Sequence, residues 1–99
     1  IEEHGLLENA VERGRQFTEL LVDADPDPVV DVRGLGLMLA VEFDTTERRD
    51  AVVEAALARG LLTLACGYRT LRVLPPMDVT EREIELGAGL LTEAIADVA

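Results

Sequence analysis

Residues 29–43 have the sequence VVDVRGLGLMLAVEF, which is the clearest strand signal in the chain. Val29 to Arg33 and Leu37 to Phe43 are rich in valine, leucine and methionine, and Gly34-Leu35-Gly36 separates them. Short apolar runs on both sides of a glycine-rich bend are typical of two neighbouring strands. We therefore expect a strand pair in this segment.

A second pair of short apolar runs follows further along the chain. Leu61 to Ala65 and Thr70 to Leu74 are divided by Gly67-Tyr68, and Pro75-Pro76 comes directly after them. Proline has no backbone N–H to donate to a neighbouring strand, so the two prolines end the pairing. The sequence thus predicts a further strand pair.

Helices are expected at both ends of the chain. From Glu2 to Ala24, apolar residues recur every three or four positions, as in an amphipathic helix, and Asp25-Pro26-Asp27-Pro28 stops the pattern. Thr80 and Glu83 have the spacing of a capping box, in which each side chain accepts a hydrogen bond from the backbone of the other residue. They predict a helix from about residue 81 to the end of the chain.

A third helix is expected between the two strand pairs. Asp44 and Glu47 have the same capping spacing, and Gly60 is placed to end the helix in left-handed geometry, so the helix runs from about residue 46 to 59. The order of elements is therefore α-β-β-α-β-β-α. The economical packing is one α+β domain over residues 1–99 with two layers, a small and mostly antiparallel sheet covered by helices on one face.

The balance of charged residues excludes several classes of partner. Twenty Asp and Glu residues stand against nine Lys and Arg residues, which gives a formal net charge of -11. This charge repels nucleic acid and anionic membranes, so we expect neither as a partner. No signal peptide opens the sequence, and a cytoplasmic location is expected. All the cations are arginine, and dense carboxylates without lysine resemble proteins of salt-loving archaea, so we expect folding to need molar salt.

Several chemically active residue types give only weak signals. Cys66 is the only cysteine, which excludes an internal disulfide and a zinc cluster of cysteines, and a small half-buried thiol is the favoured interpretation. His4 and Glu8 lie one helical turn apart without a third ligand, so no metal site is expected. Arg33-Gly34-Leu35-Gly36 lacks the following helix and the third glycine of a dinucleotide-binding loop. The chain has no serine for nucleophilic catalysis.

Arg72 is the candidate binding residue. Alternation along the last strand places Leu71 and Val73 on one face and Arg72 on the other. If the apolar pair packs under the helices, Arg72 stands on the uncovered face, where its planar fork suits a carboxylate. Spacing alone favours a solvated arginine or an internal ion pair. The neighbouring motifs instead favour Arg72 as a residue that binds a carboxylate.

These motifs resemble those of a known family. Residues 31–42, DVRGLGLMLAVE, look like the segment that opens the sheet in the C-terminal small domain of class III aminotransferases. Gly60-Leu61-Leu62, Cys66-Gly67 and then residues 71–76, LRVLPP, repeat that family's order of a glycine-led strand, a Cys-Gly pair and an Arg-x-Leu-Pro-Pro-like strand end. The resemblance covers nearly the whole chain and is nearest to the 4-aminobutyrate and acetylornithine branch.

The resemblance implies a fold type I enzyme that works as a homodimer with pyridoxal phosphate. Such an enzyme transfers an amino group from an amino acid, or from an ω-amino acid such as 4-aminobutyrate, to a 2-oxo acid. It also implies that Arg72 binds the carboxylate of the amino donor or of the 2-oxoglutarate acceptor. The loop from Tyr68 to Leu71 looks shorter than in many relatives, so Arg69 is a candidate to share this role.

The composition limits what the chain itself can do in such an enzyme. Pyridoxal phosphate needs a lysine amine for its Schiff base, and the chain has no lysine. We therefore expect a cofactor-binding large domain to precede Ile1. The chain alone is then an inactive fragment, without catalytic or cofactor-binding residues of its own.

Two other functions stay open at this point. A free-standing α+β module would bind a small ligand or a protein through the uncovered face of its sheet. A relative that keeps the aminotransferase fold would use the same cofactor for isomerisation or decarboxylation.

Overall fold

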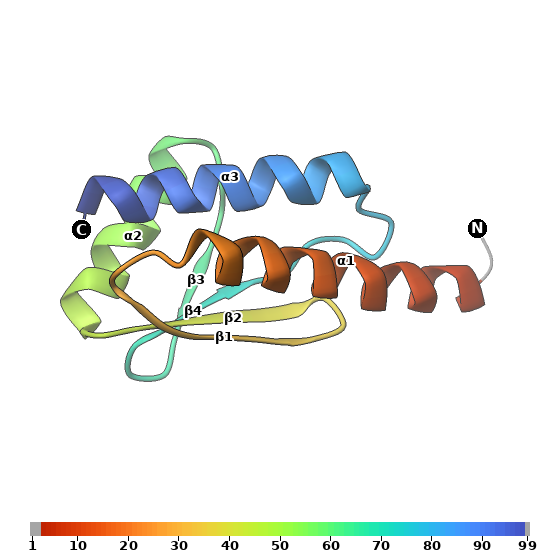
Figure 1. Ribbon diagram of the computed structural model, residues 1–99, viewed down its shortest axis with the longest axis horizontal. Helices are drawn as coiled ribbons and strands as arrows, with labels where there is room; N and C mark the ends of the chain where they lie inside the picture. Colours follow the sequence, from red (N-terminus) through yellow and green to blue (C-terminus); the bar gives the residue numbers. More distant parts are fainter. Residues whose placement is uncertain (1–2, 99) are drawn as a thin grey trace.

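The computed structural model describes residues 3–98, in which the helices and strands follow the expected order (Figure 1). The elements are α1 Glu3–Ala24, β1 Val29–Leu35, β2 Met38–Phe43, α2 Thr46–Ala58, β3 Leu64–Cys66, β4 Thr70–Val73 and α3 Glu81–Val98. The expected α+β class and the order α-β-β-α-β-β-α are confirmed.

The strands form one four-stranded antiparallel sheet in the order β1-β2-β4-β3. β1 and β2 are one hairpin, β3 and β4 are a second, and β2 pairs with β4 to join them. Arg72 therefore lies on an internal strand, with hydrogen-bonded neighbours on both sides.

The helices cover one face of this sheet and leave the other face open (Figure 1). Burial alternates along β2 and β4, so that every second side chain is buried beneath the helices. The buried strand residues are Leu39, Val41, Phe43, Leu71 and Val73, and they belong to the same hydrophobic core as Phe17, Leu21, Val52, Ile84, Ala88, Leu91 and Ile95 of the helices. The expected two layers are confirmed.

The turn between the first two strands is tighter than expected. β1 continues through Gly34 to Leu35, and only Gly36 and Leu37 form the loop. Gly36 has a φ of 56°. A two-residue hairpin loop with positive φ at its first position matches the twist of paired strands, so no wider glycine bend is needed.

The expected strand over residues 61–65 is wrong in its first three residues, because β3 begins at Leu64. The N–H groups of Gly60 and Leu61 both donate to carbonyl groups in the last turn of α2. Gly60 has a φ of 85°, as this kind of helix end requires. Leu61 thus completes the end of α2 and is not part of the sheet.

The N-cap of α2 also differs from the expectation. Thr45 is the N-cap, and its side chain accepts a hydrogen bond from the backbone N–H of Arg48. Asp44, which was expected to cap the helix together with Glu47, instead lies 3.4 Å from the guanidinium of Arg48 as an ion pair. The predicted helix was correct, and its predicted cap was one residue too early.

The capping box of α3 is confirmed. The backbone N–H of Thr80 donates to Oε1 of Glu83 at 2.9 Å, and the backbone N–H of Glu83 donates to Oγ1 of Thr80 at 3.1 Å. The first of these bonds, with a smaller contribution from the Thr80 side chain, lowers the pKa of the Glu83 carboxyl below its ordinary value. The start of α3 is therefore held by two reciprocal hydrogen bonds.

α1 crosses the tip of the β1–β2 hairpin at very short range. Gly14 is buried, and a Cβ atom built on it would lie 2.0 Å from the carbonyl oxygen of Gly36. The hydroxyl of Thr18 donates to the carbonyl oxygen of Gly14 at 3.0 Å. The contact is between two backbones, and it requires glycine at position 14.

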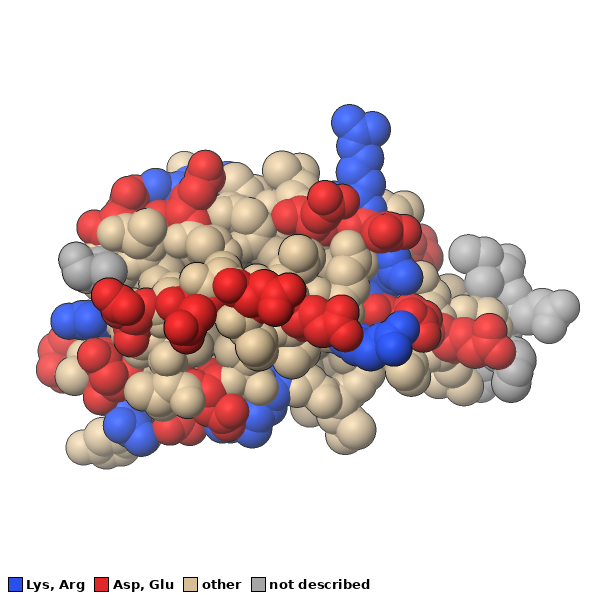
Figure 2. Space-filling view, in the orientation of Figure 1, with Lys and Arg blue, Asp and Glu red and all other residues tan. Residues whose placement is uncertain are grey.

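Acidic residues outnumber basic ones on the side of the molecule shown in Figure 2, where a band of red residues crosses the middle of the view. No helix within residues 3–98 is long and apolar enough to cross a membrane.

Candidate functional site

Arg72 lies mid-strand in β4, on the face of the sheet that the helices leave open. Its neighbours Leu71 and Val73 are buried in the core, whereas Arg72 is half-buried. Across the sheet, Arg72 pairs with Ala40 of β2 and with Leu64 of β3. The side chain of Ala40 ends at Cβ, so this direct neighbour leaves room beside the guanidinium for a ligand.

The guanidinium of Arg72 has no hydrogen bond or ion pair with any side chain or backbone group in the described part of the chain. An internal ion pair, which spacing alone allowed, is therefore excluded among residues 3–98. An unpaired arginine keeps all its N–H donors free, and the planar fork matches the two oxygens of a carboxylate.

Four other charged residues on the same face are paired with one another, and we call them the Glu42 cluster: Asp31, Arg33, Glu42 and Arg69. Oε1 of Glu42 accepts from Arg33 at 3.2 Å, and Oε2 accepts from Arg69 at 2.9 Å. Arg33 also donates to Asp31 at 2.7 Å. The hydrogen bonds to Asp31 and then to Glu42 raise the pKa of the Arg33 guanidinium.

The cluster is electrically neutral, because its two guanidinium charges cancel its two carboxylate charges. Arg72 therefore adds one uncompensated positive charge to this face, although the whole chain carries -11. Close to this local cation the field is positive, whereas at longer range the net charge repels polyanions.

Arg69 is placed differently from Arg72. It lies in the turn between β3 and β4, and its guanidinium donates to Glu42 and to the carbonyl oxygen of Asp44, the latter at 3.3 Å. It also lines a shallow depression together with Asp44 and Glu47. The structure thus places Arg69 near the same face, with its fork occupied and with carboxylates beside it.

Arg49 of α2 is a buried polar residue that the sequence analysis missed. Its guanidinium donates to the carbonyl oxygen of Thr70 at 2.8 Å and to that of Cys66 at 3.4 Å. These bonds hold the β3–β4 turn against α2. Glu42 was also missed, although alternation along β2 could have placed it on the same face as Arg72.

Three further expectations from the sequence concern Cys66, the glycine-containing segment 33–36 and a metal site at His4. Cys66 is half-buried at the end of β3, as expected. Arg33-Gly34-Leu35-Gly36 leads into a strand, so it is not a dinucleotide-binding loop. The side chain of His4 lies outside the described side chains, and among those described no group of three or more His, Cys, Asp and Glu could hold a metal ion.

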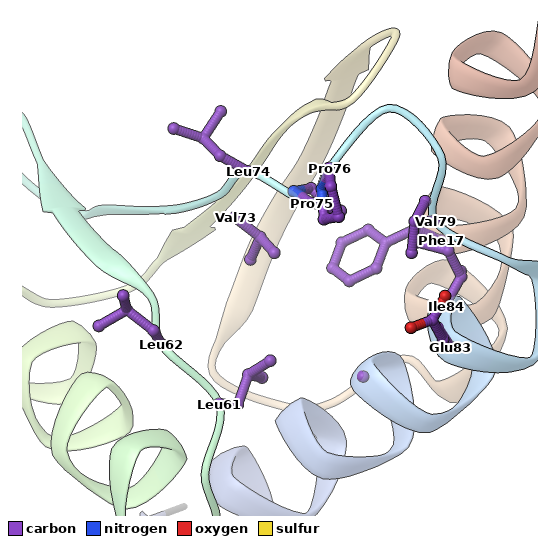
Figure 3. Close-up of a pocket in the computed structure, with 11 residues that line it drawn as sticks. Phe17, Leu61, Leu62, Val73, Leu74, Pro75, Pro76, Val79, Glu83 and Ile84 are labelled. Carbon is purple, nitrogen blue, oxygen red and sulfur yellow. The ribbon is translucent and has the colours of Figure 1, made fainter. Parts of the chain in front are cut away.

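An apolar pocket of about 210 Å³ lies where β4 ends and α3 begins (Figure 3). Figure 3 shows Phe17 on one side of it and Leu61 and Leu62 on the other. Among residues 3–98, Glu83 is the only charged residue that lines it, and the carboxylate of Glu83 accepts a hydrogen bond from the backbone N–H of Thr80. No Lys or Arg side chain among residues 3–98 lines this pocket, so it differs in charge from the surroundings of Arg72.

Comparisons with known proteins identify the family. A family model described as Aminotransferase class-III matches residues 1–95. An L-lysine-epsilon aminotransferase from Amycolatopsis lactamdurans is 40% identical over an alignment of 100 residues that covers 97% of this chain and 22% of that protein. An acetylornithine aminotransferase from Thermosynechococcus vestitus is 38% identical over an alignment of 104 residues that covers 100% of this chain and 25% of that protein.

The fold agrees with a solved structure of the same kind. The lysine aminotransferase from M. tuberculosis superposes with a TM-score of 0.89 at 32% identity, over 97% of this chain and 23% of that one. This chain spans about a quarter of the length of these relatives. The resemblance seen in the motifs is thus confirmed over nearly the whole chain, and the chain belongs to the class III aminotransferases.

Proposed function

We propose that this chain is the C-terminal small domain of a pyridoxal-phosphate-dependent aminotransferase and that Arg72 binds the carboxylate of its substrates. The observation that carries the proposal is the unpaired, half-buried guanidinium of Arg72 on the open face of the sheet. The intact enzyme would transfer an amino group from an amino acid to a 2-oxo acid and work as a homodimer.

An ω-amino acid is the proposed amino donor. The names of the relatives include lysine, ornithine and acetylornithine, which are compounds with a carboxylate at one end and a nitrogen at the other. The expected donor 4-aminobutyrate likewise has a carboxylate at one end and an amine at the other. Arg72 recognises only the carboxylate end, so its role is the same for each of these donors and for the 2-oxo acid.

The residues of this chain do not fit a covalent site for pyridoxal phosphate. The cofactor is held through a lysine amine, and the chain contains no lysine. We propose that the cofactor is bound by a large domain in another part of the protein. The present domain would then form one wall of the active-site cleft.

Arg72 contributes to the reaction by positioning the substrate. Its backbone is held on both sides, by β2 and by β3, so the guanidinium projects from a rigid base. Two parallel charge-assisted hydrogen bonds from one guanidinium fix both the place and the tilt of a carboxylate. Holding the substrate in this way directs its reactive end toward the cofactor, which lowers the entropic cost of reaction.

The test is the substitution Arg72→Met in the intact enzyme. We expect the KM for carboxylate substrates to rise by about 10- to 100-fold, the effect of losing a charge-assisted hydrogen-bonded pair. The amount of bound cofactor, read from its visible absorbance, should stay unchanged. Arg82→Met is the matched control, because Arg82 is exposed on α3 and has no partner among residues 3–98. An unchanged KM in Arg72→Met would remove Arg72 from the substrate site.

A further inference from the structure

Glu42 and Arg72 lie on neighbouring strands of the sheet, β2 and β4. In the pairing of β2 with β4, Glu42 is opposite Thr70 and Ala40 is opposite Arg72. Glu42 and Arg72 are therefore diagonal neighbours on the same face, and long side chains in this relation can meet. Opposite charges at such positions normally attract each other, yet Glu42 and Arg72 form no ion pair.

The reason lies in the other partners of Glu42. Arg33 occupies Oε1 from the β1 side, and Arg69 occupies Oε2 from the β3–β4 turn. Each arginine is itself anchored elsewhere, Arg33 by Asp31 and Arg69 by the carbonyl oxygen of Asp44. The Glu42 side chain is 25% exposed, so little of its carboxylate remains for a third cation.

We infer that Arg69 and Arg33 are positioning residues for Arg72: they occupy both oxygens of Glu42 and so keep Glu42 from capturing the guanidinium that the substrate needs. The inference rests on the proposed function of Arg72. It assigns Arg69 a role other than direct binding of the substrate carboxylate. The depression beside Arg69 supports this role, because Asp44 and Glu47 line it and would repel a second carboxylate.

Removing Arg69 should therefore weaken substrate binding indirectly. Oε2 of Glu42 would lose its partner while the side chain stays largely covered, which is unfavourable for a charged group. The unpaired guanidinium of Arg72 would then swing to Glu42. The substrate carboxylate would have to compete with Glu42 for the same fork.

A double-variant experiment separates this mechanism from direct contact. The intact enzyme, Arg69→Met, Glu42→Gln and the combination of both are compared for the KM and kcat of a carboxylate-bearing amino donor. Arg69→Met should raise this KM by about tenfold with little change in kcat, because a competing ion pair must be broken. Adding Glu42→Gln should return the KM to within about twofold of the unsubstituted enzyme, because the competitor is gone. Glu42→Gln alone should not raise the KM.

An alkylamine donor that has no carboxylate supplies an internal control. Its KM should stay the same in all four proteins, because it does not use Arg72. A general loss of structure would raise this KM as well, and the rescue by Glu42→Gln would not occur.

The inference is overturned if Arg69→Met leaves the carboxylate KM unchanged, or if the double variant keeps the raised KM, since Arg69 would then act directly. If Arg69→Met fails to fold, as seen by circular dichroism, Arg33→Met frees the other oxygen of Glu42 and should show the same rise and the same rescue. A different result would contradict the proposed function: an unchanged KM for carboxylate substrates in Arg72→Met.

Discussion

On the face of the sheet that the helices cover, β4 places Leu71 and Val73, and both are buried in the core. On the opposite face, the same strand places Thr70 and Arg72, and both are half-buried. The covered face is held by removal of apolar area from water, which contributes roughly 25 cal/mol per Å². The open face is organised by charge pairs near solvent, which contribute much less. Under the proposed function, stability and substrate recognition lie on opposite sides of one strand.

Substitutions of matched leucines would test this separation most strongly. Leu71 is 0% exposed on the covered face, and Leu64 on the adjacent strand is 49% exposed. Leu71→Ala should lower the free energy of unfolding by about 2–5 kcal/mol, because it leaves a cavity in the core. Leu64→Ala should lower it by less than about 0.5 kcal/mol. Urea unfolding of both variants measures the difference, and equal losses would show that the two faces are not distinct.

Salt should act on the two regions with opposite signs. Screening reduces the repulsion among the carboxylates that produce the net charge of -11, so the folded state gains. We expect the Tm to rise by about 10 °C between dilute buffer and molar KCl, which corresponds to about 2 kcal/mol for a domain of this size. The same salt should raise the KM for carboxylate substrates, because it screens Arg72. A thermal melt that is as high in dilute buffer as in KCl would contradict the expected need for salt.

The capping box of α3 offers the smallest of these effects. Thr80→Ala should lower the free energy of unfolding by about 1 kcal/mol, because it removes an N-cap. The carboxylate KM should not change, because the cap belongs to the helical layer. A changed KM would mean that the two layers are coupled at this point.

The same box predicts how stability depends on pH. The pKa of Glu83 is lower in the folded state than its ordinary value, because the backbone N–H of Thr80 donates to the carboxylate. The folded state therefore gains from the charged carboxylate above the ordinary pKa and loses that gain as pH falls through the lowered one. Compared with Glu83→Gln in urea unfolding, the unsubstituted chain should be more stable at neutral pH, with a difference that disappears in acid.

The sequence was sufficient to predict the order of helices and strands, because local chemistry sets where most of these elements begin and end. The paired prolines end β4, Gly60 ends α2, and the box of Thr80 and Glu83 starts α3. The side of the sheet on which Arg72 lies followed from the two-residue repeat of a strand alone. Each of these signals acts over a few residues.

The incorrect N-cap of α2 and the missed pairing of Glu42 both depend on contacts between residues that are distant in the sequence. Asp44 and Thr45 can both cap a helix. The backbone N–H of Asp44 donates to the carbonyl oxygen of Pro28, which lies far from α2 in the sequence. The pairing of Arg69 with Glu42 joins residues 27 positions apart. It depends on the register between strands, which the sequence pattern alone does not specify.

The crossing of α1 over the hairpin tip makes tolerance to mutation uneven along that helix. At Gly14, even the single methyl group of alanine would meet the carbonyl oxygen of Gly36, and backbone cannot move aside as a flexible side chain can. One turn earlier and one residue later, Val11 and Arg15 are exposed, so we expect substitutions there to be tolerated better than at Gly14. Gly14 is therefore a position where geometry alone excludes every side chain.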